Sequence, residues 1–438
     1  MNELFEKQMQ ELLKEEYPAY KKSLEEPARR GFRINTLKGS AEHFFSVMDI
    51  PYEKSPFCDN GYYTDVTNGI GFTPLYMAGA FYMQEPSASS AVTVLRPLEG
   101  MKVLDLCAAP GSKSTQIAEK LGNTGLLVAN EINSSRCKVL LENIERHGNT
   151  NTIVTNCDTK YLAEQFEGFF DAVLCDAPCS GEGMMRKEEE AEKQWTPQLV
   201  ESCAAIQEEI LENAYICLNS GGVLVYSTCT LNMQENEYQI LQFLKKHPDM
   251  HMEDAGVSFG RRGFLSEMDI DKSVRIFPMD GGEGHFVARI RKNGSKETVH
   301  ASLMKSDAVS KDTLKEVNAL LEKPYPYYFM KQGRLYGGVS PFYDTGKARL
   351  VRNQVLIGEE KKGRFEFAHH FFMSAYTDIV NRYDMNEEEC RKYMHGEQIE
   401  GNVSKGWYQM CYHGYALGGT KSDGKSLKNK YPKAFRTR

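Results

Sequence analysis

Two cysteines, Cys179 and Cys229, stand in contexts that suit covalent catalysis. Cys179 follows an apolar run and the segment Asp176-Ala177-Pro178, and Cys229 ends a second apolar run between two threonines. A lone cysteine in such a place is more often structural, but two at neighbouring strand ends favour a nucleophile and a partner. One reaction that needs this chemistry is methylation of carbon 5 of cytosine. There a thiolate adds to ring carbon 6, and a proton donor serves ring nitrogen 3.

A second group of residues suits a nucleoside ligand. The tight turn Cys107–Lys113 follows one predicted strand, Glu131 follows the next, and Asp158 the one after. Glu131 is suited to accept hydrogen bonds from ribose hydroxyls and Asp158 to hold an adenine amino group, although each taken singly is more simply a solvated loop carboxylate. The turn lacks the G-x-G-x-x-G and P-loop patterns of nucleotide phosphate sites. Together these residues favour adenosine without phosphates, and S-adenosylmethionine fits that description.

The spacing of apolar runs predicts the elements that hold these residues. From residue 101 onward, short apolar strands alternate with helical stretches, which is typical of a parallel sheet built from βαβ units. Ligands of such sheets bind beyond the carboxyl ends of the strands, where the residues above converge. The predicted strands are 101–106, 125–130, 151–156, 170–176 and 221–229, the helices are Ser112–Leu121, Ser134–His147 and Leu199–Leu218, and a closing hairpin joins 274–278 to 285–292.

Length and composition limit the class of protein. The chain has 438 residues, of which 41% are hydrophobic and 26% charged, a composition typical of a globular protein of about three domains. No apolar run approaches the roughly 18–20 residues of a membrane helix, and the charged N-terminus lacks the apolar segment of a secretory signal. We therefore expect a cytoplasmic protein with no membrane association.

The eleven cysteines do not form a disulfide or metal framework. Their number is odd, and Cys175 with Cys179 has no second pair or histidine cluster at zinc-ligand spacing. We expect no metal site. Most of the others are expected to be buried thiols of a reducing cytosol: Cys58, Cys137, Cys157, Cys203, Cys217, Cys390 and Cys411.

Charge is distributed unevenly along the chain. The 53 basic and 60 acidic residues sum to −7, but residues 421–438 hold seven cations and one aspartate, a sum of +6 that leaves −13 on the rest. Local potential, rather than the net sum, governs attraction to phosphate. This basic tail, with Tyr431 and Phe435 among its lysines, suits an arm that tracks RNA and stacks on its bases. Further candidates for phosphate contacts are Arg33, Lys38, Arg186 and Lys187.

Three motifs carry a resemblance to a known enzyme family. CAAPGSKS at 107–114, DAPCSGEG at 176–183 and STCT at 227–230 resemble the Nol/Nop/Sun-type RNA 5-methylcytosine methyltransferases. The segments 184–195 and 406–432 resemble the bacterial RsmF (YebU)-like branch of that family. The resemblance implies an enzyme that modifies small-subunit ribosomal RNA.

The resemblance also implies a role for each matching residue. Cys229 would be the nucleophile that attacks carbon 6, Cys179 the second cysteine needed to release product, and Asp176 the group that hydrogen-bonds the cytosine edge. Ser112 replaces the second glycine of the family's CAAPGGK, which would cost about 1 kcal/mol if that backbone needed a positive φ. The implied S-adenosylmethionine site comprises Cys107, Ala108, Ala109, Pro110, Gly111, Ser112, Lys113, Glu131, Arg136, Asp158 and Asp176.

The implied fold class is α/β, a Rossmann-like class I methyltransferase core with an N-terminal α+β RNA-binding domain and a C-terminal PUA-like module. The expected divisions are an N-terminal RNA-binding domain at 1–92, the methyltransferase domain at 93–293, an intermediate RsmF-type domain at 300–370, and a PUA-like module with a basic tail at 371–438.

The expected function is S-adenosylmethionine-dependent methylation of carbon 5 of cytosine in 16S ribosomal RNA through a covalent Cys229 adduct. We expect a monomer whose partner is ribosomal RNA or the small ribosomal subunit. Two alternatives stay open: the same chemistry on tRNA, which composition does not separate, and a ribosome-assembly RNA-binding protein without activity. The intact pair of Cys179 and Cys229 argues against the second alternative.

Overall fold

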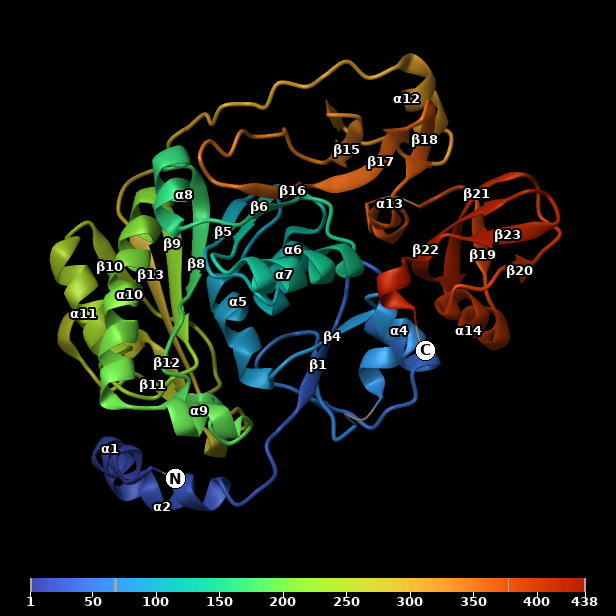
Figure 1. Ribbon diagram of the computed structural model, residues 1–438. Coiled ribbons are helices and arrows are strands. Elements are labelled where there is room, and N and C mark those ends of the chain that lie inside the picture. The colour runs from blue at the N-terminus through green and yellow to red at the C-terminus, as the bar shows by residue number, and fades with distance from the viewer. Residues whose placement is uncertain (1, 67–68, 377, 437–438) are drawn as a thin grey trace.

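The computed structural model describes residues 2–66, 69–376 and 378–436. Its centre is a ten-stranded mixed sheet in the order β11-β12-β13-β9-β8-β5-β6-β7-β16, with β10 paired to β13 (Figure 1). Five neighbouring strands are parallel: β5 (Lys102–Asp105), β6 (Leu126–Asn130), β7 (Thr152–Thr155), β8 (Phe170–Asp176) and β9 (Leu218–Thr228). The others pair antiparallel: β10 (Met250–Glu253), β11 (Arg261–Arg262), β12 (Val274–Ile276), β13 (His285–Lys292) and β16 (Leu350–Asn353).

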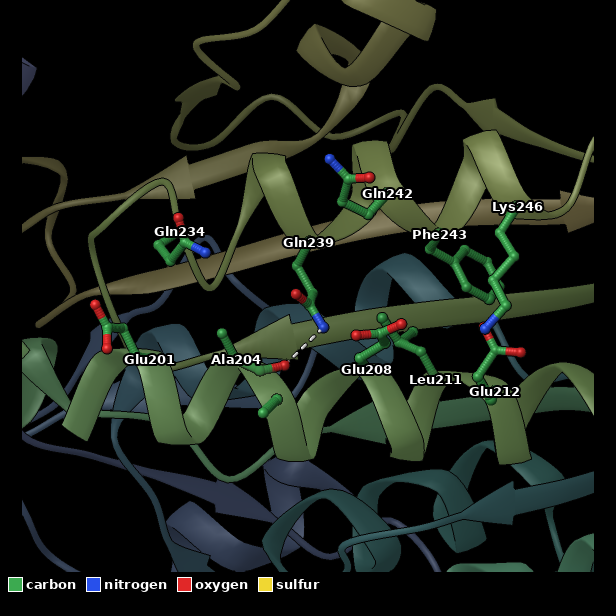
Figure 2. A pocket seen from close by; sticks show the side chains of 11 residues that line it. Glu201, Ala204, Glu208, Leu211, Glu212, Gln234, Gln239, Gln242, Phe243 and Lys246 are labelled. Carbon is green, nitrogen blue, oxygen red and sulfur yellow. Dashed lines mark hydrogen bonds and ion pairs between the residues drawn. The ribbon is translucent and has the colours of Figure 1, made fainter. Parts of the chain in front are cut away.

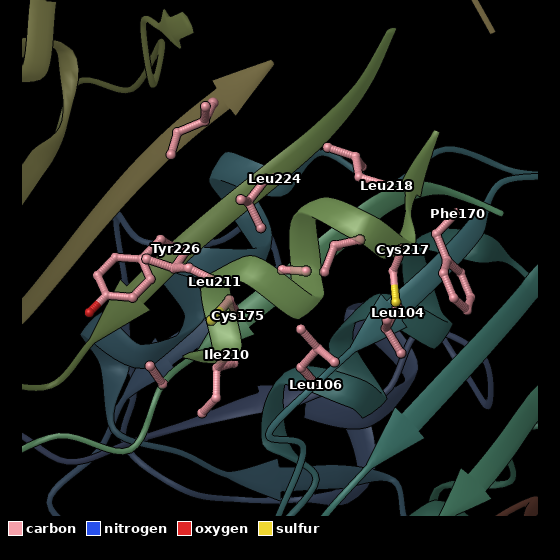
Figure 3. Close-up of a cluster of buried hydrophobic side chains, with 14 of the residues drawn as sticks. Leu104, Leu106, Phe170, Cys175, Ile210, Leu211, Cys217, Leu218, Leu224 and Tyr226 are labelled. Carbon is pink, nitrogen blue, oxygen red and sulfur yellow. The ribbon is translucent and has the colours of Figure 1, made fainter. Parts of the chain in front are cut away.

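Helices cover both faces of this sheet, because successive strand residues point to opposite sides. Val103 packs with Ile117 of one helical layer, whereas Leu104 packs with Leu211 of the other. Figure 3 shows the second layer, where Leu224 of β9 lies near Leu211 and Leu104 of β5 lies near Cys217. The first layer comprises α5 (Ser90–Leu95), α6 (Ser112–Leu121) and α7 (Ser134–His147), and the second α8 (Thr159–Gln165), α10 (Pro197–Cys217) and α11 (Glu237–Lys246).

The parallel core agrees with the prediction, and the expected α/β fold class is confirmed. Helices α6 and α7 have the predicted bounds, and β12 and β13 form the predicted antiparallel pair. Helix α10 begins two residues earlier than predicted, because the side chain of Thr196 accepts the backbone N–H of Leu199 and Pro197 occupies the first turn. Strand β9 begins at Leu218 rather than at residue 221.

The N-terminal and C-terminal units share one hydrophobic core. Phe32 and Phe81 of the N-terminal sheet belong to the same buried cluster as Tyr408, Leu417 and Tyr431. The N-terminal unit contains α1 (Glu3–Leu13), α2 (Tyr17–Ser23), α3 (Ala41–Val47), α4 (Pro74–Met77) and the sheet of β2 (Glu53–Lys54), β3 (Gly61–Tyr63), β1 (Gly31–Ile34) and β4 (Phe81–Met83). The C-terminal unit contains α14 (Glu387–His395) and the sheet of β19 (Arg382–Asp384), β21 (Gly406–Tyr412), β22 (Tyr415–Ser422), β23 (Ser426–Asn429) and β20 (Ile399–Glu400).

The segment between the core and the C-terminal unit has its own small sheet but also extends the central one. Strand β16 pairs with β7, so residues 350–353 belong to the ten-stranded sheet (Figure 1). The small sheet contains β14 (Tyr327–Lys331), β15 (Arg334–Gly338), β17 (Val355–Lys361) and β18 (Arg364–Phe367), and the remaining helices are α9 (Glu189–Gln194), α12 (Lys311–Asn318) and α13 (His369–Met373). Within the described ranges, the structure contains no helix with the length and apolarity to cross a membrane.

Candidate active site

A cavity of about 310 Å³ opens beyond the carboxyl ends of β5 to β9. It is lined by Leu106, Cys107, Ala109, Asn130, Glu131, Ile132, Arg136, Asp158, Thr159, Asp176, Ala177, Pro178, Cys179, Ile206, Glu209, Ile210 and Cys229. A second hollow of about 250 Å³ lies between α10 and α11 and is lined mainly by glutamate and glutamine side chains (Figure 2). That second hollow contains none of the predicted site residues, so the first cavity is the candidate site.

The turn after β5 forms one wall of this cavity. The peptide bond between Ala109 and Pro110 is cis, and Gly111, with φ of 110°, precedes helix α6. Asn143 donates to the Pro110 carbonyl at 2.8 Å, and the Ala108 N–H donates to Asn130 at 2.8 Å. Gly111 therefore carries the left-handed conformation that favours glycine, whereas Ser112 is the first residue of α6. The strain considered for Ser112 does not arise.

Two carboxylates, those of Glu131 and Asp158, line the end of the cavity near β6 and β7, and hydrogen bonds fix their positions. Glu131 is 3% exposed, and its Oε1 accepts the backbone N–H of Asn133 at 2.8 Å. Its Oε2 lies 3.5 Å from Nη1 of Arg136, which also donates through Nη2 to the Ala109 carbonyl at 2.8 Å. Asp158 caps α8 by accepting the N–H of Lys160 at 3.0 Å. Hydrogen bonds thus hold both carboxylates in place in the lining of the cavity.

The lining residues fit S-adenosylmethionine. Four carboxylates line the cavity with one guanidinium, and exposed Ile132 and Ile206 add apolar surface. This charge balance disfavours phosphate and suits a ligand that carries a sulfonium and an ammonium group. Carboxylates at the ends of neighbouring strands also suit ribose and adenine donors. The carboxylates are those of Glu131, Asp158, Asp176 and Glu209.

Asp176, at the end of β8, is held by two donors. Lys113 Nζ lies 2.8 Å from its Oδ2, and the Ser227 hydroxyl donates to its Oδ1 at 2.7 Å. Burial alone would raise the pKa of Asp176, but the Lys113 ammonium and these hydrogen bonds outweigh burial and hold the pKa below its ordinary value. His285 Nε2 lies 4.0 Å from Oδ1. Asp176 is therefore an oriented carboxylate at the cavity wall.

Cys179 and Cys229 meet on the same wall. Their sulfur atoms are 3.2 Å apart, because the parallel pairing of β8 and β9 places Asp176 opposite Ser227 and the loops leave side by side. The hydrogen bond with Cys229 and burial raise the pKa of Cys179 well above its ordinary value. Cys179 thus keeps its proton at neutral pH and can donate it toward the neighbouring sulfur.

A buried polar cluster below the cysteines fixes both loops. Glu235 accepts the backbone N–H of Ser180 at 3.0 Å and also bonds the Ser180 hydroxyl. Gln207 donates to Glu235 at 2.8 Å and to the Pro178 carbonyl at 2.9 Å. The Ser180 and Thr230 hydroxyls lie 2.8 Å apart, which joins the two cysteine loops directly. These hydrogen bonds hold the two cysteine loops against each other, as rigid positioning requires.

Most of the predicted site residues converge on the cavity. Eight line it directly: Cys107, Ala109, Glu131, Arg136, Asp158, Asp176, Cys179 and Cys229. Lys113 lies behind Asp176, and Ala108, Pro110, Gly111 and Ser112 shape the turn without lining the cavity. Sequence reasoning missed Ile132, Ile206 and Glu209. The sequence offers one signal for Ile132, because it is a large apolar residue directly after Glu131 at the end of a predicted strand, and such side chains suit ligand contact.

Two of the four single-residue candidates for phosphate contacts, Arg33 and Lys38, are wrong. Arg33 is 1% exposed and pairs with Glu119, and the ammonium of Lys38 donates to the carbonyls of Ala78 and Arg146. Arg186 forms an ion pair with Glu283 and donates to the carbonyls of Ser23 and Glu26. Arg33 and Lys38 thus join structural units and do not present charge to a ligand. Arg186 and the fourth candidate, Lys187, both line a groove of about 530 Å³ with Arg30 and Tyr76.

The tail also differs from the prediction. Tyr431 is 3% exposed and packs against Tyr393 and His369, so its ring does not stack on RNA. The lysines around it are exposed. The seven cysteines predicted to be buried thiols, from Cys58 to Cys411, are all free and buried, as expected.

Comparison with known proteins identifies the class as ribosomal RNA methyltransferases. Residues 92–291 match the family described as 16S rRNA methyltransferase RsmB/F. Residues 1–86 match the N-terminal domain of 16S rRNA methyltransferase RsmF, and residues 380–437 match the methyltransferase RsmF PUA domain. The order of these three matches is that of the units described above.

Individual relatives agree with the family match. The chain is 34% identical over 442 residues to ribosomal RNA small subunit methyltransferase F of Aeromonas salmonicida, which covers 94% of this chain and 91% of the relative. It is 35% identical over 447 residues to the protein of the same name from Vibrio parahaemolyticus, with 93% and 91% covered. A solved methyltransferase homolog from Pyrococcus horikoshii is 28% identical, with a TM-score of 0.59 over 67% of this chain and 95% of that one. The chain belongs to the RsmF family of small-subunit ribosomal RNA methyltransferases.

Proposed function

We propose that this protein transfers a methyl group from S-adenosylmethionine to carbon 5 of cytosine in 16S ribosomal RNA, through a covalent bond between Cys229 and carbon 6. The observation that carries this proposal is the pair of sulfur atoms, 3.2 Å apart, on the wall of the acidic cavity. Family membership supports ribosomal RNA as the substrate.

The donor end of the cavity is the end near β6 and β7. Bound S-adenosylmethionine would supply an electrophilic methyl group. Glu131 would accept hydrogen bonds from the ribose hydroxyls, and Asp158 would accept one from the adenine amino group. Ile132 offers an apolar surface beside them. The turn 107–113, with Arg136 holding its Ala109 carbonyl, would close the remaining side.

Cytosine would bind at the other end of the cavity, near β8 and β9. Three groups that would take part in the reaction lie there: Asp176, Cys179 and Cys229. Cys229 adds to carbon 6 as a thiolate, which saturates the ring double bond and makes carbon 5 nucleophilic. Charge then develops near ring nitrogen 3. Asp176, as an ionised carboxylate, would accept hydrogen bonds from the neighbouring amino group of the base and from nitrogen 3 once that nitrogen is protonated. Lys113 and Ser227 fix both oxygens of Asp176 before the base arrives. Once Cys229 is bonded to carbon 6, its thiol no longer raises the pKa of Cys179, so Cys179 can release its proton to solvent. As a thiolate, Cys179 would then take the carbon 5 proton after methyl transfer, the electrons of that C–H bond would restore the ring double bond, and Cys229 would leave as a thiolate.

Basic surface outside the cavity would hold the RNA. The groove lined by Arg30, Tyr76 and Lys187 combines cations with an aromatic ring, which suits a single strand leaving the site. The exposed lysines in and after the last two strands of the C-terminal unit would contact phosphates: Lys421, Lys425, Lys428, Lys430 and Lys433. The target base must leave its stack to reach Cys229.

We also propose the functional division into residues 1–92, 93–293, 300–370 and 371–438. The separate outer sheets support it, although β16 is shared with the central sheet. A monomer in the cytoplasm completes the proposal. The eleven free cysteines suit a reducing compartment.

Labelled S-adenosylmethionine tests the proposal. The protein is incubated with 16S ribosomal RNA, with the small subunit, and with tRNA as the competing substrate, and bisulfite sequencing then locates 5-methylcytosine. We expect label in 16S RNA at a bisulfite-resistant cytosine. Label at another atom, in tRNA alone, or nowhere would contradict the proposal.

A further inference from the structure

Residues 32–38, which the sequence suggested for RNA contact, instead join the N-terminal sheet to the helices of the donor site. Arg33 lies on β1 and is 1% exposed, and Asn35 just after β1 is 0% exposed. Asn35 donates to the carbonyls of Gly79 and His147 at 2.8 Å each. These side chains are therefore directed toward α6 and α7 rather than toward solvent.

The Arg33 guanidinium makes four contacts with different acceptors. Nη2 donates to the Ser112 carbonyl at 3.1 Å and to the Thr115 hydroxyl at 2.7 Å. Nη1 pairs with buried Glu119, and Nε donates to the Gln84 side chain at 3.2 Å. A planar, always charged fork can hold several acceptors at fixed angles, which a lysine ammonium cannot reproduce.

Glu119 satisfies the buried charge independently of the donor turn. It also accepts a hydrogen bond from Asn60 at 2.7 Å and contacts His147 Nε2 at 2.9 Å. A buried arginine requires a carboxylate partner, and Glu119 provides it. The two bonds from Nη2 are additional to that pairing, and both end on the first turn of α6.

That turn leads directly to the active site. Ser112 and Thr115 flank Lys113, whose ammonium lies 2.8 Å from Asp176, and they follow the turn that forms the cavity wall. Thr115 also donates to the Gly111 carbonyl at 2.8 Å, so the hydroxyl held by Arg33 is bonded to the glycine of that turn. The hydrogen bonds thus run from Arg33 on β1 through Thr115 to Gly111, in the turn beside the cavity.

Another buried arginine provides a comparison. Arg289 is 7% exposed and pairs with Glu253 at 2.7 Å. Its remaining contacts are the carbonyls of Val94 and Leu95, at 2.7 and 2.9 Å, and neither residue lines the cavity. Arg33 and Arg289 therefore share burial and ion pairing, but only Arg33 contacts the first turn of α6.

We propose that Arg33 is a positioning residue of the methyl-donor site: from the N-terminal sheet it holds the first turn of α6, and thereby the donor turn and Lys113, in the geometry that binds S-adenosylmethionine. This inference rests on the proposed function only in the identity of the ligand. It assigns to the N-terminal unit a direct part in donor binding, in addition to any contact with RNA.

Calorimetric titration with S-adenosylmethionine, without RNA, tests the inference. Arg33→Lys retains a cation for Glu119 but loses the fork, and we expect donor affinity to fall about tenfold or more. Arg289→Lys is the matched control. It should change donor affinity by no more than about twofold, and it should lower the melting temperature about as much as Arg33→Lys does. A loss of affinity restricted to Arg33→Lys is a result that general destabilisation would not give.

Thr115→Val keeps the inference testable if Arg33→Lys does not fold. It removes one acceptor of Nη2, and we expect donor affinity to fall about threefold. In the double variant, Arg33→Lys with Thr115→Val should lose less affinity than the two single losses predict when they are added, because both substitutions remove the hydrogen bond between Nη2 and the Thr115 hydroxyl. Unchanged affinity in folded Arg33→Lys or Thr115→Val, or an equal loss in Arg289→Lys, would overturn the inference.

The same titration separates this inference from the proposed function. If the wild-type protein binds the donor but methylates no cytosine, the proposed function is contradicted. The donor affinities of Arg33→Lys and Arg289→Lys then still test the inference. Wild-type protein that does not bind the donor contradicts both. Wild-type binding with normal affinity in Arg33→Lys contradicts the inference alone.

Discussion

The sulfur atoms of Cys179 and Cys229 lie 3.2 Å apart, although 50 residues separate the two cysteines in the chain. The parallel pairing of β8 and β9 produces this approach, and the cluster around Glu235 maintains it. The shared hydrogen bond and burial raise the pKa of Cys179 well above its ordinary value. The two sulfurs are therefore close enough for one to act on a group that is bonded to the other.

Glu131→Gln should weaken donor binding by about 10- to 100-fold. The substitution keeps the shape of the side chain but replaces a charged acceptor, and a hydrogen bond to a charged group contributes about 1.5–3 kcal/mol. Calorimetric titration with S-adenosylmethionine measures the change. Glu209→Gln removes the same charge from the same cavity. An equal loss in both variants would show a general charge effect in place of the predicted ribose contact.

Replacing Lys428, Lys430 and Lys433 by Gln should weaken RNA binding and reduce its salt dependence. Each phosphate contact on a single strand contributes about 0.7 to the slope of log affinity against log salt, so three contacts contribute about 2. The control replaces Lys305, Lys311 and Lys315, which are equally exposed. Filter binding at several salt concentrations gives both slopes. If the tail variant kept the wild-type slope, the C-terminal lysines would have no phosphate contacts.

His147→Gln should change the pH dependence of stability. Burial lowers the pKa of His147 to about 3, so the folded protein keeps it neutral while the unfolded chain protonates it near pH 6.5. Between about pH 6.5 and 3 the unfolded chain binds one more proton at this residue than the folded protein does. Each unit by which the pH is lowered in this range therefore reduces the free energy of unfolding by about 1.4 kcal/mol. Gln can keep the hydrogen bond to Glu119 without titrating.

Urea unfolding of both proteins at pH 7, 6, 5 and 4.5 measures this effect. Groups that do not contact His147 contribute equally to both proteins, so they cancel in the difference. The stability advantage of the wild-type protein over His147→Gln should shrink as the pH falls below 6.5. A difference that stayed constant from pH 7 to 4.5 would contradict a neutral, buried His147.

The parallel core could be predicted because its signals are local. Strand β6 is apolar at nearly every position since both of its faces are covered. Helix α7 begins at Ser134 because the Asn133 side chain accepts two backbone N–H groups, and it ends where Gly148 adopts a φ of 82°. Because β8 and β9 are neighbouring parallel strands, the loops that carry Cys179 and Cys229 must leave the sheet at the same edge.

The roles of the charged residues could not be predicted in the same way. Arg33 has the residue type of a phosphate contact, but its partner Glu119 lies 86 residues away on α6. Tyr431 stands among lysines, yet its ring packs in a core that the two ends of the chain share. Nothing local distinguishes a buried cation from an exposed one, because its partners are set by tertiary packing. The same holds for Glu235, which only the folded chain brings to Ser180.

The central claim is that Cys229 bonds transiently to carbon 6 of cytosine, and trapping that bond tests it most directly. Cys179→Ala is incubated with S-adenosylmethionine and 16S RNA and then analysed on a denaturing gel, beside Cys229→Ala and the double variant. The account predicts a protein–RNA band that resists denaturant in Cys179→Ala and no such band in either variant that lacks Cys229. A resistant band in the double variant, or its appearance in Cys229→Ala alone, would contradict the account.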